Sequence, residues 1–193
     1  MIDMTLGKQL WASLKALLVF TLVLGIAYPL VISALARVLP ANADGSMIVS
    51  SGRVVGSSLL GQAATQPQWF QARPSASEYS GDTSGGSNWG PNAPELAQLI
   101  ADREQTLRAA NPGAPQGPIP ADALTASGSG LDPHISPAYA AWQAPRIASA
   151  SGLSLDQVQD LIRAHTQHPW LGFIGTDRVN VTELNVALEA LVR

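Results

Sequence analysis

The feature that most constrains this chain is an uninterrupted apolar run near its amino terminus. Residues 16–36 contain no charged side chain and are rich in Leu, Val, Ile and Ala. A helix of this length spans roughly 30 Å, which matches the hydrocarbon thickness of a bilayer. Trp11 lies just before the run, where an aromatic residue at the membrane interface is expected. The run therefore predicts a transmembrane helix.

The charges beside the run predict its orientation. Lys8 and Lys15 precede it, whereas Arg37 is the only basic residue that closely follows it. Because basic residues favour the cytoplasmic side, residues 1–15 are expected to form a cytoplasmic tail. The rest of the chain would then lie outside the cytoplasm, as a single-pass membrane protein.

A cleaved signal peptide is the alternative interpretation of this segment. Residues 34–36 and 41–43 both have the A-x-A form that signal peptidase sites favour. The apolar part of a signal peptide is about 7–15 residues long, which is shorter than the run observed here. The length therefore favours an uncleaved anchor.

Pro29 lies inside the apolar run and predicts a mild kink in the helix. Its missing N–H frees the carbonyl of Gly25, four residues earlier, and glycine tolerates the resulting crowding best. A freed carbonyl in lipid needs another hydrogen-bond donor. We therefore expect Gly25 and Pro29 to face a neighbouring membrane helix.

Composition excludes several classes of function. The chain has no Cys, so disulfides, thiolate metal sites and Cys nucleophiles are excluded. No Lys follows Lys15, which excludes a Walker A loop and a lysine nucleophile in the rest of the chain. The formal net charge of −3 does not fit a nucleic-acid-binding protein.

Beyond a short linker over residues 37–46, residues 47–193 are expected to fold as a helix-rich α+β domain. Ser51-Gly52 predicts a hairpin turn between two strands, and Ser154 with Gln157 predicts a capping box. Ser136 before Pro137 predicts a helix start, and Gly152 predicts the end of that helix. The expected strands are 47–49, 53–60 and 178–181; the expected helices are 94–110, 137–150, one from 155 to before Pro169, and a last helix carrying Leu184, Leu188 and Leu191.

Two segments rich in Gly, Ser and Pro are expected to be structured loops. The first covers residues 66–94 and the second covers residues 125–137. The first loop holds a candidate nest of backbone N–H groups for a nucleotide phosphate: Ser84, Gly85, Gly86, Ser87 and Asn88. Its S-G-G core resembles the signature motif of ABC transporters. The alternative is a loop whose polar groups bond its own backbone.

A serine hydrolase is a second candidate activity. Ser87 or Ser129 could act as nucleophile with His134 as base, and Asp132 is close in sequence. Neither serine has the spacing of a G-x-S-x-G elbow. A local turn at Asp132-Pro133 explains the same residues without catalysis.

His165 and His168 could begin a metal site, since they are three residues apart near a helix end. Histidines at a helix C-terminus are also favoured by the helix dipole. The sequence offers no third ligand beside them, so we predict no metal site and no catalytic residue.

Several loop motifs together carry a resemblance to a known family. In order along the chain these are residues 56–62, 69–76, 84–91, 125–137 and 178–181. With the amino-terminal anchor, the set resembles the C subunit of the bacterial Kdp potassium-transporting P-type ATPase over essentially the whole chain. Trp69 and Trp89 stand where Tyr and Leu are more often expected.

The resemblance implies a non-catalytic subunit of a high-affinity, ATP-driven potassium import complex. Its partners would be a channel-like subunit that binds potassium, a P-type subunit that binds and hydrolyses ATP, and a small single-helix subunit. The family is described as needed for assembly and as a catalytic chaperone that raises the affinity of the ATPase subunit for ATP. A ternary complex with nucleotide has been suggested for it.

The expected topology conflicts with direct contact between this chain and ATP, because it places both loops outside the cytoplasm. We therefore expect the outer domain to lie over the potassium entrance and to influence ATP use indirectly. A cytoplasmic nucleotide-binding regulator is the alternative if the topology is reversed. We expect four residues to order the loops or contact a partner: Arg73, Asn88, Asp132 and His134.

Overall fold

The computed structural model describes residues 5–192 of the chain. It divides into two compact units, Met1–Ser46 and Met47–Arg193. Each unit is described by itself below. Together they give the α+β class that the sequence predicts, with one long apolar helix near the amino terminus.

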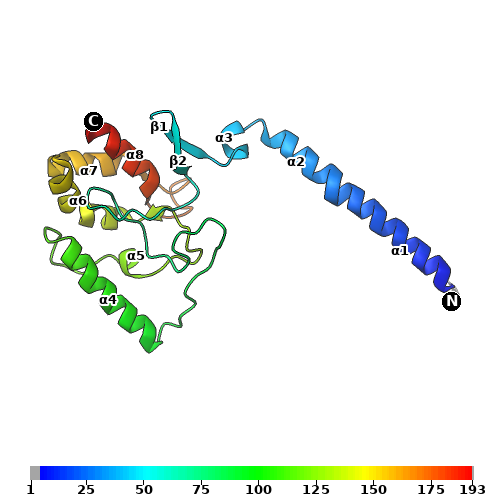
Figure 1. Cartoon of the computed structure of the whole chain (residues 1–193), viewed down its shortest axis with the longest axis horizontal. Helices are drawn as coiled ribbons and strands as arrows, with labels where there is room; N and C mark the ends of the chain where they lie inside the picture. The colour runs from blue at the N-terminus through cyan, green and yellow to red at the C-terminus, as the bar shows by residue number, and fades with distance from the viewer. Residues whose placement is uncertain (1–4, 193) are drawn as a thin grey trace. The chain divides into compact units, whose positions relative to one another are not determined.

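The first unit is dominated by a continuous helix, drawn in blue in Figure 1. It consists of α1 (Leu6–Phe20), the π-helical stretch η1 (Thr21–Ala27) and α2 (Tyr28–Ala36). Over Leu6–Ala36 it has 31 residues and a mean hydropathy of 2.3, so it is long and apolar enough to cross a membrane. The helix begins well before residue 16, because the residues from Leu6 onward also favour helix.

The stretch η1 lies directly before Pro29 and contains Gly25. Its end is marked by the N–H of Tyr28, which donates to the carbonyl of Val23, five residues earlier. A π-helical turn absorbs one extra residue within a helix, and such turns are a recognised cause of helix bending. Because α2 continues the same helix, the missing N–H of Pro29 leaves a carbonyl in the preceding turn without its helical donor.

After α2 the chain forms one short turn of helix, α3 (Pro40–Ala43), inside the segment expected to be a linker. Pro40 occupies its first position, which suits a residue without an N–H. A four-residue helix has no apolar period to detect, so the sequence does not predict it.

The second unit begins with the antiparallel hairpin of β1 (Met47–Ser50) and β2 (Arg53–Ser57). Ser51 and Gly52 both have positive φ, at 50° and 75°, as a tight hairpin turn requires. The predicted hairpin is therefore confirmed. The second strand ends at Ser57, three residues before the predicted Leu60.

A second sheet has the order β3-β5-β4, with β5 in the centre and both pairings antiparallel. Its strands are β3 (His134–Ile135), β4 (Thr166–Gln167) and β5 (Arg178–Asn180). The sequence predicts only the central strand. The other two are two residues long, too short to show any alternation.

The helices of this unit are α4 (Pro94–Ala110), α5 (Ala121–Leu124), α6 (Pro137–Ser151), α7 (Leu155–Ala164) and α8 (Val181–Val192). Their caps are local and follow the predictions. Ser136 Oγ accepts the N–H of Tyr139 at 3.0 Å, and Gly152 ends α6 with φ 70°. The capping box of Ser154 and Gln157 is complete at the start of α7.

Asn180 caps α8 from the end of strand β5. Its Oδ1 accepts the backbone N–H groups of Thr182 at 3.1 Å and Glu183 at 3.2 Å. Its Nδ2 donates to the carbonyl of Ser58 at 2.7 Å. One side chain therefore joins the sheet, the last helix and the chain after the hairpin.

The core lies where α6, α7 and α8 gather beside β5 (Figure 1). Helix α7 contacts both α6 and α8, while α6 and α8 each contact β5. The largest fully buried side chains are Tyr139, Phe70, Ile147, Leu184, Leu188, Gln143, Val158 and Val179.

Leu184 and Leu191 provide a matched pair on α8. Leu184 is fully buried, whereas Leu191 is 53% exposed. Leu184→Ala should lower the free energy of unfolding by about 2–5 kcal/mol, because it removes buried methyl groups and leaves a cavity. Leu191→Ala should change it by under about 0.5 kcal/mol. Denaturant unfolding of the detergent-solubilised chain measures both; equal losses would contradict the assigned core.

Candidate functional site

The two predicted Gly- and Ser-rich loops meet in the second unit. We call residues 73–90 the Ser84 loop and residues 125–133 the Gly130 loop. The N–H of Gly85 and the hydroxyl of Ser84 both donate to the carbonyl of Ser129, at 2.8 and 3.1 Å. The N–H of Ser127 donates to the carbonyl of Pro74 at 3.1 Å. These bonds hold together two segments that are far apart in sequence. We call this contact between the Ser84 loop and the Gly130 loop the loop crossing.

Gly130 is the tightest point of this crossing. Its φ is 69°, in the region that favours glycine, and Ser75 Oγ donates to its carbonyl at 2.6 Å. A Cβ added at Gly130 would meet the hydroxyl of Ser77 and would lie 2.8 Å from the carbonyl oxygen of Gly85. Both conformation and space therefore require glycine here.

A third segment joins the crossing at Gly61. Its N–H donates to the carbonyl of Leu131 at 2.8 Å. A Cβ at Gly61 would lie 2.7 Å from the carbonyl oxygen of Asp132 and 2.7 Å from the ring of Tyr79. The chain after the hairpin is thus packed directly on the Gly130 loop.

Beside the crossing, Arg73, Asp132 and His134 form a charged cluster. The Arg73 guanidinium lies 3.5 Å from Asp132 Oδ2 and also donates to the carbonyl of Ala126 at 3.5 Å. The backbone N–H of His134 donates to Asp132 Oδ1 at 3.0 Å, and its ring Nδ1 lies 3.3 Å from the same oxygen. Asp132 is the centre of the cluster.

The electrostatics follow from these contacts. The hydrogen bond from the His134 side chain is the largest effect that lowers the pKa of Asp132, with smaller contributions from its backbone N–H and from Arg73. Burial, reinforced by the charge of Asp132, raises the pKa of Tyr79 to about 12. The Tyr79 hydroxyl donates to the carbonyl of Arg73. Tyr79 therefore acts as a neutral hydrogen-bond donor.

Asn88 stands apart from this cluster. It is exposed and has a φ of 54°, which asparagine tolerates better than most residues. The structure thus brings together Arg73, Asp132 and His134, and leaves the fourth predicted contact residue on the surface of the Ser84 loop.

Two residues of the expected phosphate nest, Ser84 and Gly85, are bonded to the chain itself. The Ser84 hydroxyl and the Gly85 N–H both bond to Ser129, and Gly86 packs against Gly128. Ser87 and Asn88 are exposed. This geometry favours the alternative that the sequence left open, in which the polar groups of the loop satisfy one another.

The serine hydrolase geometry is not assembled. Ser129 Oγ accepts the N–H of Leu131 at 3.1 Å, and Ser87 lies on the exposed part of its loop. Within residues 5–192, neither serine is hydrogen-bonded to His134. The His134 ring instead faces Asp132, as the local-turn interpretation predicts.

His165 and His168 are each engaged with a different partner. His165 Nδ1 lies 2.9 Å from the carbonyl of Leu161 at the end of α7, and His168 Nδ1 lies 2.8 Å from Asp177 Oδ1. The part of the chain that the structure describes holds no group of three or more His, Asp or Glu residues placed to bind a metal.

The charged cluster opens into a cleft of about 410 Å³. Its other polar lining residues include Asp122, Asp177 and Arg178. The Asp122 carboxylate is already bonded to Ser136, whose backbone N–H donates to it at 2.7 Å and whose hydroxyl donates to it at 3.0 Å. Charges that are paired and partly exposed in this way suit a polar contact with another surface better than acid–base catalysis.

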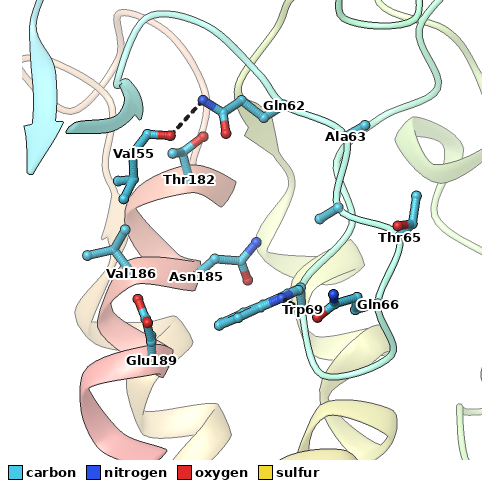
Figure 2. A pocket seen from close by; sticks show the side chains of 11 residues that line it. Val55, Gln62, Ala63, Thr65, Gln66, Trp69, Thr182, Asn185, Val186 and Glu189 are labelled. Carbon is cyan, nitrogen blue, oxygen red and sulfur yellow. Dashed lines mark hydrogen bonds between the residues drawn. The ribbon is translucent and has the colours of Figure 1, made fainter. Parts of the chain in front are cut away.

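A second groove, of about 300 Å³, lies between β2, the segment 62–69 and helix α8, and Figure 2 shows it from close by. Gln62 closes one end by donating to the carbonyl of Val55 at 3.0 Å, drawn as a dashed line. Trp69 lies on the opposite side of the groove from Val186 and Glu189 of α8. Sequence reasoning missed this groove, because its three walls come from distant segments without a shared motif.

The chain therefore combines one helix that is long and apolar enough to span a membrane with an α+β unit whose Gly- and Ser-rich loops are bonded to one another. Comparison with known proteins makes this specific. Residues 10–190 match the family model KdpC, described as K+-transporting ATPase, c chain. The chain belongs to this family, and the resemblance seen in the loop motifs is thereby confirmed.

Close relatives cover nearly the whole chain. A protein of Methylococcus capsulatus is 49% identical over 93% of this chain and 96% of its own length. One of Polaromonas naphthalenivorans is 50% identical over 90% of both chains, and one of Caulobacter vibrioides is 50% identical over 95% of this chain and 93% of its own. Each is named Potassium-transporting ATPase KdpC subunit.

Gly130 and Gly128 test the loop crossing as a matched pair. Gly130→Ala should lower the free energy of unfolding by about 2 kcal/mol or more, because it combines left-handed strain with a clash against Gly85. Gly128→Ala should be nearly neutral, since a Cβ there meets nothing within 4 Å. Thermal unfolding of the solubilised chain measures both variants. Two similar melting temperatures would rule out the described packing.

Asp132 should make the domain sensitive to acid. Because its folded-state pKa is lowered, its stabilisation is present above the ordinary value of 3.8 and is lost as pH falls through the folded-state pKa. Asp132→Asn should therefore be less stable than the parent at neutral pH and should lose less stability on acidification to about pH 3. Denaturant midpoints across this range measure the effect, with exposed Glu78→Gln as control. Parallel curves for parent and Asp132→Asn would contradict the pairing.

Proposed function

We propose that this chain is a non-catalytic accessory subunit of a high-affinity, ATP-driven potassium import complex. The observation that carries the proposal is the family match over residues 10–190, to c chains of K+-transporting ATPases. The relatives' printed names say that each is a subunit of a potassium-transporting ATPase. The loop geometry supports a role without chemistry, because the Ser129 hydroxyl accepts the N–H of Leu131, and Ser84 and Gly85 both donate to the carbonyl of Ser129.

The proposed location is the bacterial cytoplasmic membrane, crossed once. In this proposal, residues 1–15 form the cytoplasmic tail and residues 16–36 form the transmembrane helix. Residues 37–46 form the linker and residues 47–193 form the extracytoplasmic domain. The placement of both lysines before the crossing supports this orientation. The length and hydropathy of Leu6–Ala36 support a membrane-spanning helix.

The proposed partners are a channel-like potassium-binding subunit, a P-type ATPase subunit and a small single-helix subunit. In the membrane, the π-helical stretch around Gly25 offers a non-standard helix surface to a neighbour. Outside it, the cleft holding Arg73, Asp132 and His134 offers a polar surface with both signs of charge. Exposed Asn88 is placed to contact a partner from the Ser84 loop.

The effect on ATP use is proposed to be indirect. The ATPase subunit binds the nucleotide, and this chain raises its affinity for ATP by stabilising the assembled complex over the potassium entrance. Binding of nucleotide by the Ser84 loop itself is the alternative. The engagement of Ser84 and Gly85 with Ser129 weighs against it.

Affinity purification in mild detergent tests the proposal. From potassium-starved cells, the tagged chain should carry a P-type ATPase and a channel-like protein, with potassium-stimulated ATP hydrolysis. Asp132→Ala should reduce the yield of complex several-fold, while Asp156→Ala on the exposed surface of α7 should leave it unchanged. Purification of the parent chain alone, under conditions that preserve other membrane complexes, would overturn the proposal.

A further inference from the structure

A short turn between β4 and β5 carries an unusual concentration of exposed apolar side chains. We call residues 169–175 the apolar turn. Trp170 is 69% exposed, Leu171 66%, Phe173 76% and Ile174 47%. No charged residue occurs between His168 and Asp177. Large aromatic side chains each offer about 150–250 Å² for burial, so the turn presents a contiguous apolar patch of the size that marks interaction sites.

Four backbone N–H groups of the apolar turn are bonded within the turn itself. Trp170 and Ile174 exchange both of their backbone hydrogen bonds, at 3.0 and 2.9 Å. The N–H of Gly172 donates to the carbonyl of Pro169 at 3.0 Å. Polar backbone groups that are already paired cost little to remove from water. The turn can therefore enter an apolar environment without leaving these groups unsatisfied.

The base of the turn is polar. His168 and Asp177 lie on either side of it and are joined by a contact of 2.8 Å, with both side chains mostly exposed. An apolar centre surrounded by a polar rim is the usual anatomy of a protein–protein interface. Trp is among the residues that most often dominate the binding energy of such interfaces.

We propose that the apolar turn docks into an apolar recess on the extracytoplasmic side of another subunit of the same complex. This inference rests on the proposed function, because it requires both the partner subunits and the outward placement of the domain. The turn is too small to form a stable interface alone, since specific interfaces bury about 1,200–2,000 Å². It acts as the anchor of a larger contact.

Charge argues for a protein partner rather than a lipid surface. Residues 47–193 contain twelve carboxylates, eight arginines and no lysine. Segments that lie on membranes usually place Lys and Arg beside their apolar residues, to meet anionic lipids. Here the net charge of the domain is negative. The residues beside the turn include one arginine and one carboxylate: the Arg178 guanidinium lies 3.8 Å from where a Cβ on Gly175 would be, and Asp177 precedes it in the sequence. A protein recess imposes no such electrostatic penalty.

Site-specific photocrosslinking tests this inference in the full chain within its complex. A photoreactive phenylalanine analogue at Phe173 should crosslink to another subunit of the purified ATPase, identified by peptide mass spectrometry. The same analogue at Leu155, which is 42% exposed on α7, is the control and should give at least tenfold less product. A Phe173 crosslink to lipid, to a second copy of this chain, or to nothing above the control would overturn the inference.

A paired substitution measures the contribution of the turn. Trp170→Ser with Phe173→Ser should reduce the amount of partner subunit retained on the tagged chain at least tenfold. Leu155→Ser should leave it unchanged. Because both altered side chains are exposed, the melting temperature of the isolated chain should stay within a few degrees of the parent. Unchanged retention would overturn the inference.

These outcomes separate the two proposals. If the parent chain brings down its partners and the turn variants do so equally well, the turn is not the anchor while the proposed function stands. If the parent chain brings down no partner, the proposed function fails and the inference fails with it.

Discussion

The second unit depends on how the backbone of its long irregular segments is satisfied. Phe70 and Gln71 lie in no strand, and two side-chain amides bond to their backbone groups instead. The Asn185 side chain accepts the N–H of Phe70 at 2.8 Å and donates to its carbonyl at 2.9 Å. The Gln143 side chain accepts the N–H of Gln71 at 2.8 Å and donates to its carbonyl at 3.0 Å. Buried Arg146 adds bonds to the Asn111 side chain and to nearby backbone carbonyls. Because these amides come from α6 and α8, the core helices hold the loops directly, and loop order is coupled to core packing.

This arrangement uses several of the hydrogen-bond donors in loops that are rich in Gly, Ser and Asp. Residues of these types can hold a phosphate or position a nucleophile, but only while their donors are free. At the crossing, donors of Ser84, Gly85 and Ser75 are used on carbonyls of the Gly130 loop. The result is a surface of internally bonded loops with a few paired charges.

Sequence reasoning succeeded where the determinants are local. The caps at Ser136 and Ser154, the turn at Ser51-Gly52 and the end of α6 at Gly152 each depend on residues within a few positions of one another. It failed where pairing is distant. Strands β3 and β4 exist only because β5 lies between them, and two-residue strands have no period of their own. The residues Arg73 and Asp132 were singled out from motifs, yet nothing in the sequence states that they meet across the crossing.

The distribution of exposed apolar residues gives the remaining physical argument. In the first unit they cover the surface of the helix from Leu6 to Ala36, and the most apolar stretch of this helix is not buried by the rest of the chain. In the second unit they are most concentrated in residues 169–175, where four backbone N–H groups are already paired. An isolated chain in water would leave both surfaces hydrated at a cost of about 25 cal/mol per Å². Because both surfaces are apolar and exposed, removing either from water would lower the free energy of the chain in proportion to the area buried.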